Sequence, residues 1–153
     1  VLVNNAGTDR FAFFVNTDEA LWDFVLAVNL RGTIAVTHAV LDGMQRRGRG
    51  AIINVASEAG RVGSQGSAVY SAAKGGVIAF TRAIARESSR FGVRINAVAP
   101  GPIDTPLLNK RPVVPDAEAR ARMMKAEDIA QCVLFCAQLP HRVVVEELLV
   151  RPR

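Results

Sequence analysis

Three side chains that can exchange or direct protons lie close together in the sequence. Tyr70 and Lys74 are four residues apart in a stretch with helical periodicity, and Ser57 lies upstream, just after an apolar run. Four residues are slightly more than one helical turn, so the phenol and the ammonium group project from the same face. An unperturbed tyrosine has a pKa of about 10 and needs a nearby positive charge to exchange protons at neutral pH. We expect Lys74 to supply that charge, which predicts a proton-transfer site.

The spacing of Tyr70 and Lys74 also occurs by chance on amphipathic helices, so the elements around the pair matter. Short apolar runs predict strands at residues 1–3, 51–55, 94–98 and 143–150. Helical periodicity predicts helices at 18–45, 67–91, 116–124 and 127–139. This alternation predicts an α/β fold with a parallel sheet between layers of helices, in which ligands bind beyond the carboxyl ends of the strands. A polar, proline-marked stretch within residues 104–124 predicts a lid or substrate loop.

Length and composition favour one domain, residues 1–153, and exclude several other classes of protein. Half of the residues are hydrophobic, and the net charge of +5 comes from scattered basic residues without a nucleic-acid-binding motif. Cys132 and Cys136 are expected to be small buried hydrophobes, and no cluster of ligands predicts a metal site. We find no run of about 18 apolar residues and no signal segment, so we expect a cytoplasmic protein without a membrane partner.

Five short motifs stand at the ends of the predicted strands and in the two long predicted helices. They are Asn4-Asn5-Ala6-Gly7, Asn29 in Val28-Asn29-Leu30, Ser57, Tyr70-x-x-x-Lys74 and Pro100-Gly101-x-x-x-Thr105. In order and spacing these motifs closely resemble the short-chain dehydrogenase/reductase family in its compact single-domain form. The resemblance covers nearly the whole chain and is firmest over residues 1–107. It implies the C-terminal part of a doubly wound Rossmann-type parallel sheet with three α/β/α layers.

The resemblance implies that the family's reaction, the NAD(P)-dependent interconversion of a ketone or aldehyde and an alcohol, takes place here. Tyr70 would be the general acid and base, and Ser57 would hold the same substrate oxygen. Lys74 would bind the nicotinamide ribose and lower the pKa of Tyr70, and Asn29 would anchor a proton-relaying water. The residues alone leave open a helix-kinking Asn29 and a capping Ser57. Cofactor contacts, to NAD or NADP, are expected from Asn4, Ala6, Gly7, Tyr70, Lys74, Pro100, Gly101, Ile103 and Thr105.

The segment that precedes the Asn4–Gly7 motif in the family is not found in this sequence. Family members carry three further strand-helix units there, with a Gly-rich turn for the pyrophosphate and the residue that selects NAD or NADP. No Gly-x-x-x-Gly-x-Gly pattern occurs in the chain. We therefore interpret the chain as an N-terminally truncated reductase. A catalytically inactive remnant that acts at most as an interaction module stays open as the alternative, and the motifs disfavour an extended-type epimerase or dehydratase.

The resemblance further implies a small-molecule carbonyl or alcohol substrate and a homo-oligomer, either a dimer or a tetramer. The subunits would meet through the helix at 18–45 and the helix that carries Tyr70. On the second of these helices Ala72, Gly76, Ala79 and Ala83 form a row of small residues. Such a row suits a close subunit contact and tight packing within one chain equally well.

Overall fold

The sheet consists of four parallel strands whose order in space is their order in the chain. In this computed structural model, which describes residues 1–153, the strands are β1 (Leu2–Asn4), β2 (Gly50–Val55), β3 (Val93–Pro100) and β4 (Glu147–Val150). The two central strands are almost entirely buried, as parallel strands covered on both faces should be. The last strand begins four residues later than expected. Before it the chain turns at Pro140, whose carbonyl accepts a hydrogen bond from the Val143 amide.

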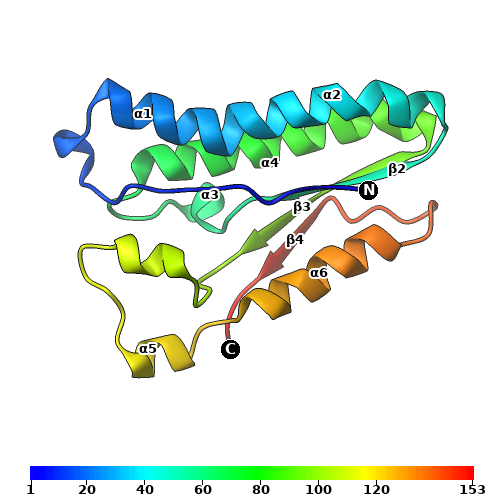
Figure 1. Cartoon of the computed structure of the whole chain (residues 1–153). Helices are drawn as coiled ribbons and strands as arrows, with labels where there is room; N and C mark the ends of the chain where they lie inside the picture. Colours follow the sequence, from blue (N-terminus) through cyan, green and yellow to red (C-terminus); the bar gives the residue numbers. More distant parts are fainter.

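Helices cover both faces of the sheet (Figure 1), which confirms the expected α/β/α layers. α1 (Glu19–Leu26), the π-helical turn η2 (Ala27–Arg31) and α2 (Gly32–Arg46) form one continuous rod. α4 (Ala68–Ser88) lies beside this rod, and α6 (Ala126–Gln138) covers the opposite face. The shorter elements are η1 (Phe14–Asn16), α3 (Ala59–Val62), η3 (Ser89–Phe91), η4 (Pro106–Lys110) and α5 (Ala117–Ala121).

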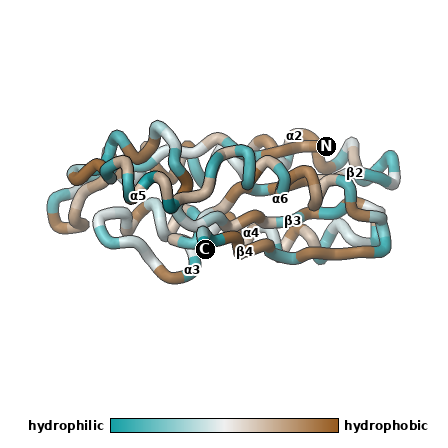
Figure 2. The backbone as a smooth tube through the Cα atoms, turned by 90° about the horizontal axis from the view of Figure 1, so that it is seen from below, coloured by the Kyte–Doolittle hydropathy of each residue, from teal (hydrophilic) through white to brown (hydrophobic).

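The two faces of β2 belong to different hydrophobic cores. Ile52 packs with Met44 of α2 and Ile84 of α4. Its neighbour Ile53 points the other way and packs with Ile129 of α6. Successive side chains of a strand point to opposite faces, so an uninterrupted apolar run is what a strand between two helical layers requires. Figure 2 shows such a hydrophobic run in β4, next to β3.

The crossover from β3 to β4 has the opposite hand to the two crossovers before it. All three crossovers step in the same direction across the sheet. The helices of the first two lie on one face and α6 lies on the other. Because parallel crossovers are right-handed in nearly all proteins, the last one is the left-handed exception. Its long connection, residues 101–125, covers the carboxyl edge of the sheet before α6 begins.

The rod from Glu19 to Arg46 corrects one expectation from the sequence. It spans 28 residues, and an 18-residue stretch within it has a mean hydropathy of 1.5, so the rod is long and apolar enough to cross a membrane by length and composition alone. The expectation of no such segment was wrong because Arg31 is the single charged residue between Asp23 and Asp42. The core helix of a soluble protein passes the same test. Here the buried positions of the rod, Val25, Asn29, Thr33, Thr37 and Met44, are in large part polar.

The row of small residues on α4 is explained in part by packing within the chain. A Cβ atom on Gly76 would approach the Leu30 side chain of η2 to 2.9 Å, so a larger residue here would push that side chain aside. Ala72, Ala79 and Ala83 are exposed. Whether they meet a second subunit stays a prediction.

Candidate active site

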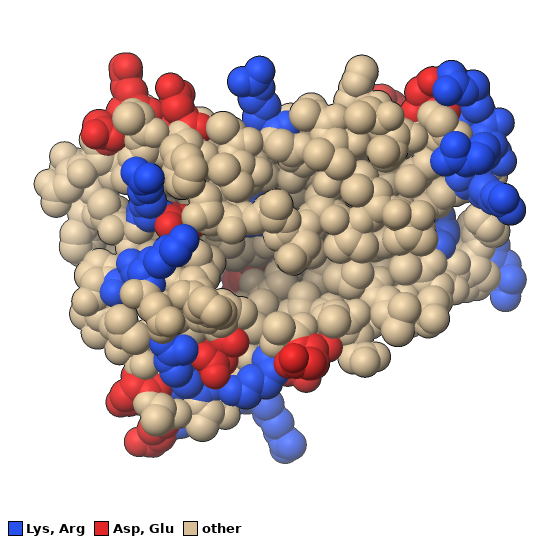
Figure 3. Space-filling view, viewed as in Figure 1, with Lys and Arg blue, Asp and Glu red and all other residues tan.

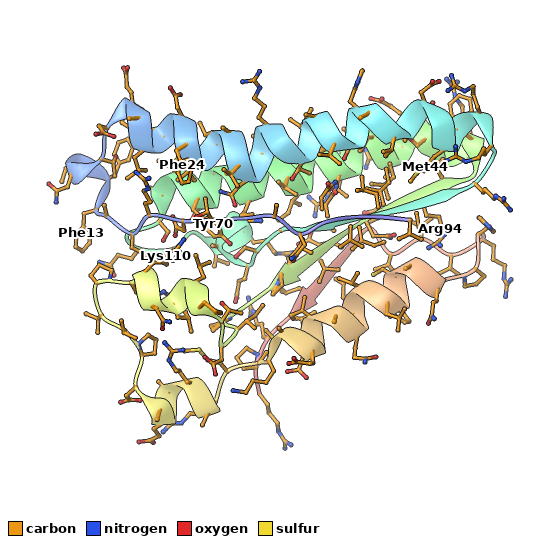
Figure 4. The ribbon with its side chains drawn as sticks, viewed as in Figure 1. Phe13, Phe24, Met44, Tyr70, Arg94 and Lys110 are labelled. Carbon is orange, nitrogen blue, oxygen red and sulfur yellow. The ribbon has the colours of Figure 1, made fainter.

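A cavity of about 480 Å³ opens at the carboxyl edge of the sheet. Its walls are the ends of β1, β2 and β3, the start of α4, and the lid, which we define as residues 104–124. Figure 3 shows a hollow near the centre of this face of the molecule, and Figure 4 shows Tyr70 between the helical layer and η4, which ends at Lys110. The predicted site residues that line the cavity are Gly7, Ser57, Tyr70, Lys74, Pro100, Gly101, Ile103 and Thr105. Asn4, Ala6 and Asn29 do not line it.

Ser57 and Tyr70 come from consecutive elements and meet through their hydroxyl groups. Ser57 follows β2, and its oxygen accepts a hydrogen bond from the Ala59 amide at 3.1 Å, which fixes its position at the strand end. Tyr70 lies in the first turn of α4 and lines the same cavity, and the Ser57 hydroxyl is near enough to lower the pKa of Tyr70. Two hydroxyl groups therefore converge on one point of the cavity, where they can bind a single substrate oxygen.

The pKa of Tyr70 differs from the expectation. Burial raises it above the ordinary value, and the negative charge of Asp9 raises it further. The Ser57 hydroxyl and the positive charge of Arg111 act in the opposite direction. The lowering by Lys74 that we expected is not found, because the ammonium nitrogen lies 5.7 Å from the centre of the ring and is engaged elsewhere. In this structure Tyr70 therefore keeps its proton at neutral pH and is suited to act as an acid.

Lys74 is a buried cation at the base of the cavity. Its side chain donates a hydrogen bond of 2.8 Å to the carbonyl of Val55, the last residue of β2. Burial lowers its pKa to about 8. A Cβ atom on Gly7 would lie 3.4 Å from the ammonium nitrogen, so the glycine leaves open space beside the charge. The ammonium group has three protons and one hydrogen-bond partner in the chain, which leaves donors for the hydroxyl groups of a ligand.

Asn29 joins the rod to the loop after β1. Its side-chain amide donates hydrogen bonds of 2.8 Å to the carbonyls of Thr8 and Val25, and its oxygen accepts one of 3.2 Å from the Thr8 amide. Its own carbonyl accepts a hydrogen bond from the Thr33 hydroxyl. The residue stands in the π-helical turn η2, in agreement with the helix-distorting role that the sequence left open. Its side chain is engaged with the protein, so it positions the loop next to Gly7.

Asn4 belongs to a buried polar network behind the cavity. Its side-chain amide donates hydrogen bonds to Thr37 of the rod at 3.0 Å and to Asn54 of β2 at 2.8 Å. The amide of Asn54 in turn donates to the Thr81 hydroxyl of α4 at 2.8 Å. The network ties two strands to two helices. The sequence offered one signal for it, an asparagine in the middle of the apolar run Ile52-Ile53-Asn54-Val55.

Three charged residues that line the cavity, Asp9, Glu58 and Arg111, were missed by the sequence reasoning. Asp9 is 3 % exposed, and one of its oxygens accepts a hydrogen bond of 2.7 Å from Ser67, the residue before α4. Burial raises the pKa of this carboxyl above its ordinary value. Arg111 enters the cavity from the lid. A charged residue two positions after the Asn4–Gly7 turn was the available signal for Asp9. Arg111 had no such signal, because the composition of the lid does not predict the path of its backbone.

The lid is attached at its base by ion pairs. Both oxygens of Asp104 are engaged at 2.8 Å, one by Arg120 of α5 and the other by Lys125 before α6. These two hydrogen bonds lower the pKa of Asp104. The predicted helix at 116–124 is shortened to α5, because the chain after it pairs with Ile103 through Met124.

Comparison with known proteins agrees with this geometry. The family model described as short chain dehydrogenase matches residues 1–113. The chain is 42% identical over 142 residues to a 3-oxoacyl-(acyl-carrier-protein) reductase of Thermotoga maritima, covering 90% of this chain and 58% of the relative. It is 38% identical over 145 residues to an acetoacetyl-CoA reductase of Rhizobium meliloti, with 90% and 59% covered. A (3R)-3-hydroxyacyl-CoA dehydrogenase of Rattus norvegicus is 41% identical over 143 residues, with 90% and 55% covered.

The chain thus spans less than two thirds of the length of these relatives. The family model nevertheless matches most of the chain, and the matched residues include all three strands that end at the cavity. The parallel sheet and the position of the cavity at its carboxyl edge are what such a match requires. This chain belongs to the short-chain dehydrogenase family.

Proposed function

We propose that this chain carries the catalytic part of an NAD(P)-dependent oxidoreductase that interconverts a ketone or aldehyde and an alcohol. The observation that supports the proposal is the convergence of Ser57, Tyr70 and Lys74 on one cavity at the carboxyl edge of a parallel sheet. A nicotinamide cofactor supplies or accepts the hydride in this chemistry. The side chains of this protein would then have to bind the substrate oxygen and move its proton.

In the reducing direction, the substrate carbonyl oxygen would lie between the hydroxyl groups of Ser57 and Tyr70. Negative charge develops on that oxygen as the bond order of the carbonyl falls, and two positioned donors stabilise it. Tyr70 would transfer its proton to the oxygen, and the raised pKa keeps that proton in place until the charge develops. Ser57 would keep the oxygen in line through its hydrogen bond. In the oxidising direction the same residues would act in reverse.

The residues around Lys74 fit a nicotinamide nucleoside. Lys74 would donate its free hydrogen bonds to ribose hydroxyls, beside the space that Gly7 leaves. Pro100, Gly101, Ile103 and Thr105 would line the nicotinamide side of the cavity. We assign Asn4 and Asn29 an indirect part, because they hold β1 and the loop after it through hydrogen bonds, and Ala6 does not line the cavity.

The first substrates to test are acyl compounds that carry an oxo or hydroxyl group on the third carbon of the acyl chain. The relatives named above include a 3-oxoacyl reductase, an acetoacetyl-CoA reductase and a 3-hydroxyacyl-CoA dehydrogenase. We propose a small-molecule substrate of this kind and a homo-oligomer, dimer or tetramer, formed through the rod and α4. Sedimentation analysis tests the second part directly.

The test of the reaction is turnover of the protein at the length that its gene encodes, with acetoacetyl-CoA and NADH or NADPH. Tyr70→Phe should lower kcat by about 10²- to 10⁴-fold, the range for loss of a general acid, while the Kd of the nucleotide changes little. Ser71→Ala is the matched control, because it removes a hydroxyl from the next residue of α4 that does not line the cavity. Undiminished turnover by Tyr70→Phe would remove Tyr70 from the mechanism.

Nucleotide binding by the 153-residue chain distinguishes the enzyme from an inactive remnant. We expect the chain alone to bind NADH and NADPH weakly, because it contains no Gly-rich turn for the pyrophosphate. Calorimetric titration of both nucleotides measures this. Tight binding would contradict the expectation and would show that the cavity residues suffice to hold the cofactor.

A further inference from the structure

Arg111 is the basic residue of the lid that lines the cavity and has no partner. The other basic residues of the lid are Arg120 and Arg122, which pair with carboxylates, and Lys110, which does not line the cavity. Arg111 forms no ion pair, and its Nε is a buried donor without a hydrogen bond. Buried donors are almost always satisfied in folded proteins. The guanidinium group as a whole has no hydrogen bond or ion pair in the chain, and Arg111 lines the cavity, which indicates an acceptor that comes from outside the chain.

Neither of the two carboxylates that line the same cavity, Asp9 and Glu58, provides that acceptor, and Glu58 is paired with Arg151. One oxygen of Asp9 accepts the Ser67 hydroxyl at 2.7 Å, and the other accepts the backbone amide of the next residue at 2.8 Å. Arg111 influences Asp9 only over a distance, and lowers its pKa without contact. The guanidinium group therefore keeps its hydrogen-bond donors free while its charge remains in the cavity.

Phe11 holds the guanidinium group in place. The central carbon of the group lies 4.8 Å from the centre of the Phe11 ring, a cation–π contact, and both residues line the cavity. A guanidinium group stacked in this way keeps its edge available for ligands. Its two terminal nitrogens are not buried and form a fork that can bind two oxygens of a carboxylate, sulfonate or phosphate at once.

We infer that Arg111 and Phe11 form an anion subsite in the catalytic cavity, and that the substrate carries a carboxylate, sulfonate or phosphate group near its reacting carbonyl. This inference rests on the proposed function, because Tyr70 marks the place of the carbonyl. Arg111 and Tyr70 line the same cavity of about 480 Å³, so one small molecule can reach both of them. The subsite selects among ketones, and it lies outside the group of residues that moves the proton.

The experiment compares ketones that differ only in their charged end. Acetoacetate, 2-oxopropanesulfonate and 2-oxopropylphosphonate carry the three anions, and methyl acetoacetate is the neutral control. Their Kd values are measured by NMR titration of the protein at the length that its gene encodes, and their KM and kcat values by NAD(P)H oxidation. The best of the three anions identifies the chemical group that the subsite prefers.

We expect Arg111→Gln to raise the Kd and KM of the preferred anion by about 10- to 100-fold, the range for a lost hydrogen bond to a charged group. The Kd of methyl acetoacetate should stay within about twofold, and Arg111→Lys should restore part of the loss. Lys110→Gln removes one positive charge from the neighbouring residue and should leave all four ligands unchanged, which controls for the net charge.

The two proposals fail in different ways. If the wild type binds the anions more strongly than the ester, loses this preference in Arg111→Gln and turns over none of the ketones, the subsite is supported and the proposed reaction is contradicted. Turnover with equal affinity for anions and ester, or an unchanged anion-to-ester ratio in Arg111→Gln, would overturn the subsite and leave the reaction intact.

Discussion

The two sides of the cavity are built in different ways. The floor, formed by the ends of β1 and β2 and the start of α4, holds its polar groups through buried hydrogen bonds, as those of Asn54 and Lys74 show. The lid is held by ion pairs near the surface, and its central carboxylate, Asp104, is 24% exposed at the side chain. The family model ends at residue 113, inside the lid. From this difference we propose that the hydrogen-bonded floor carries out proton transfer and that the lid determines the choice of substrate.

The largest effect is expected when one asparagine of the floor is compared with one asparagine of the lid. Asn54→Leu keeps the shape of the side chain but leaves the buried groups of Asn4 and Thr81 with fewer partners. We expect a loss of about 2–4 kcal/mol in the free energy of unfolding, measured by urea denaturation. Asn109→Leu, at an exposed lid residue that accepts from Arg120, should cost less than about 1 kcal/mol. Equal losses would show that the floor is no more firmly built than the lid.

Lys74 should make the floor less stable than it would be with a neutral residue. Its pKa of about 8 in the fold lies below the ordinary 10.5. Below pH 8 the lysine is charged in both states, so the folded state bears the full cost of burying the charge. As the pH rises from about 8 to 10.5, Lys74 loses its proton in the folded protein but keeps it in the unfolded chain. The cost of burying the charge therefore disappears over this range, and the free energy of unfolding rises. Lys74→Met should therefore stabilise the fold at pH 7 by up to about 3 kcal/mol, and the gain should shrink above pH 8.

Urea denaturation of both proteins at pH 7 and at pH 10 measures this effect. The lost hydrogen bond to Val55 works against the gain at both pH values alike, so the pH dependence of the difference is the informative quantity. A difference in stability that does not change between pH 7 and pH 10 would mean that the ammonium group is solvated.

Asp9 should shift the pH profile of the reaction. Its negative charge raises the pKa of Tyr70, so Asp9→Asn should lower that pKa and move the rise of alcohol oxidation to lower pH. The profile of kcat/KM against pH measures the shift. Asp116→Asn, which removes an exposed carboxylate at the start of α5 in the lid, is the matched control and should leave the profile in place. A profile that moves equally in both variants would assign the effect to net charge.

The smallest effect is expected from the ion pairs of Asp104 that attach the lid. Asp104→Asn removes the carboxylate charge with which Arg120 and Lys125 both pair, so trypsin should cleave the lid several times faster. The control is Glu118→Gln, in an exposed ion pair with Arg122, which should not change the rate of cleavage. Because the pKa of Asp104 is lowered, its contribution is complete above about pH 4 and is lost only as the pH falls further. Pepsin cleavage of the wild type should therefore accelerate below pH 4. Acceleration already between pH 7 and 5 would contradict this assignment.

The floor could be predicted from the sequence because its signals are local. Ser57, Tyr70 and Lys74 sit at strand ends and helix turns whose geometry follows from their spacing, and the structure places all three at one cavity. The contact of Asp9 with Ser67 joins residues 58 positions apart, which no periodicity reveals. The position of Arg111 depends on the course of the lid in the same way.

Two further differences between the sequence-based expectations and the structure also arise from contacts between residues far apart in the chain. The pKa of Tyr70 depends on burial and on charges from other elements, so a neighbouring lysine in the sequence was not enough to predict its direction. The hand of the last crossover depends on which face α6 covers, and the order of strands and helices along the chain does not specify it.

The π-helical turn η2 sets the rotation of the rod. Val25, Asn29, Thr33 and Thr37 are all buried at intervals of four residues, although an α-helix repeats every 3.6 residues and such a row would drift by about 40° per step. The wider turn takes up one extra residue and brings the row back into line. Deleting one residue of η2 would rotate everything after it by about 100°. Thr37 would then turn away from Asn4, so one peptide unit far from Tyr70 determines how the rod is aligned with the first strand.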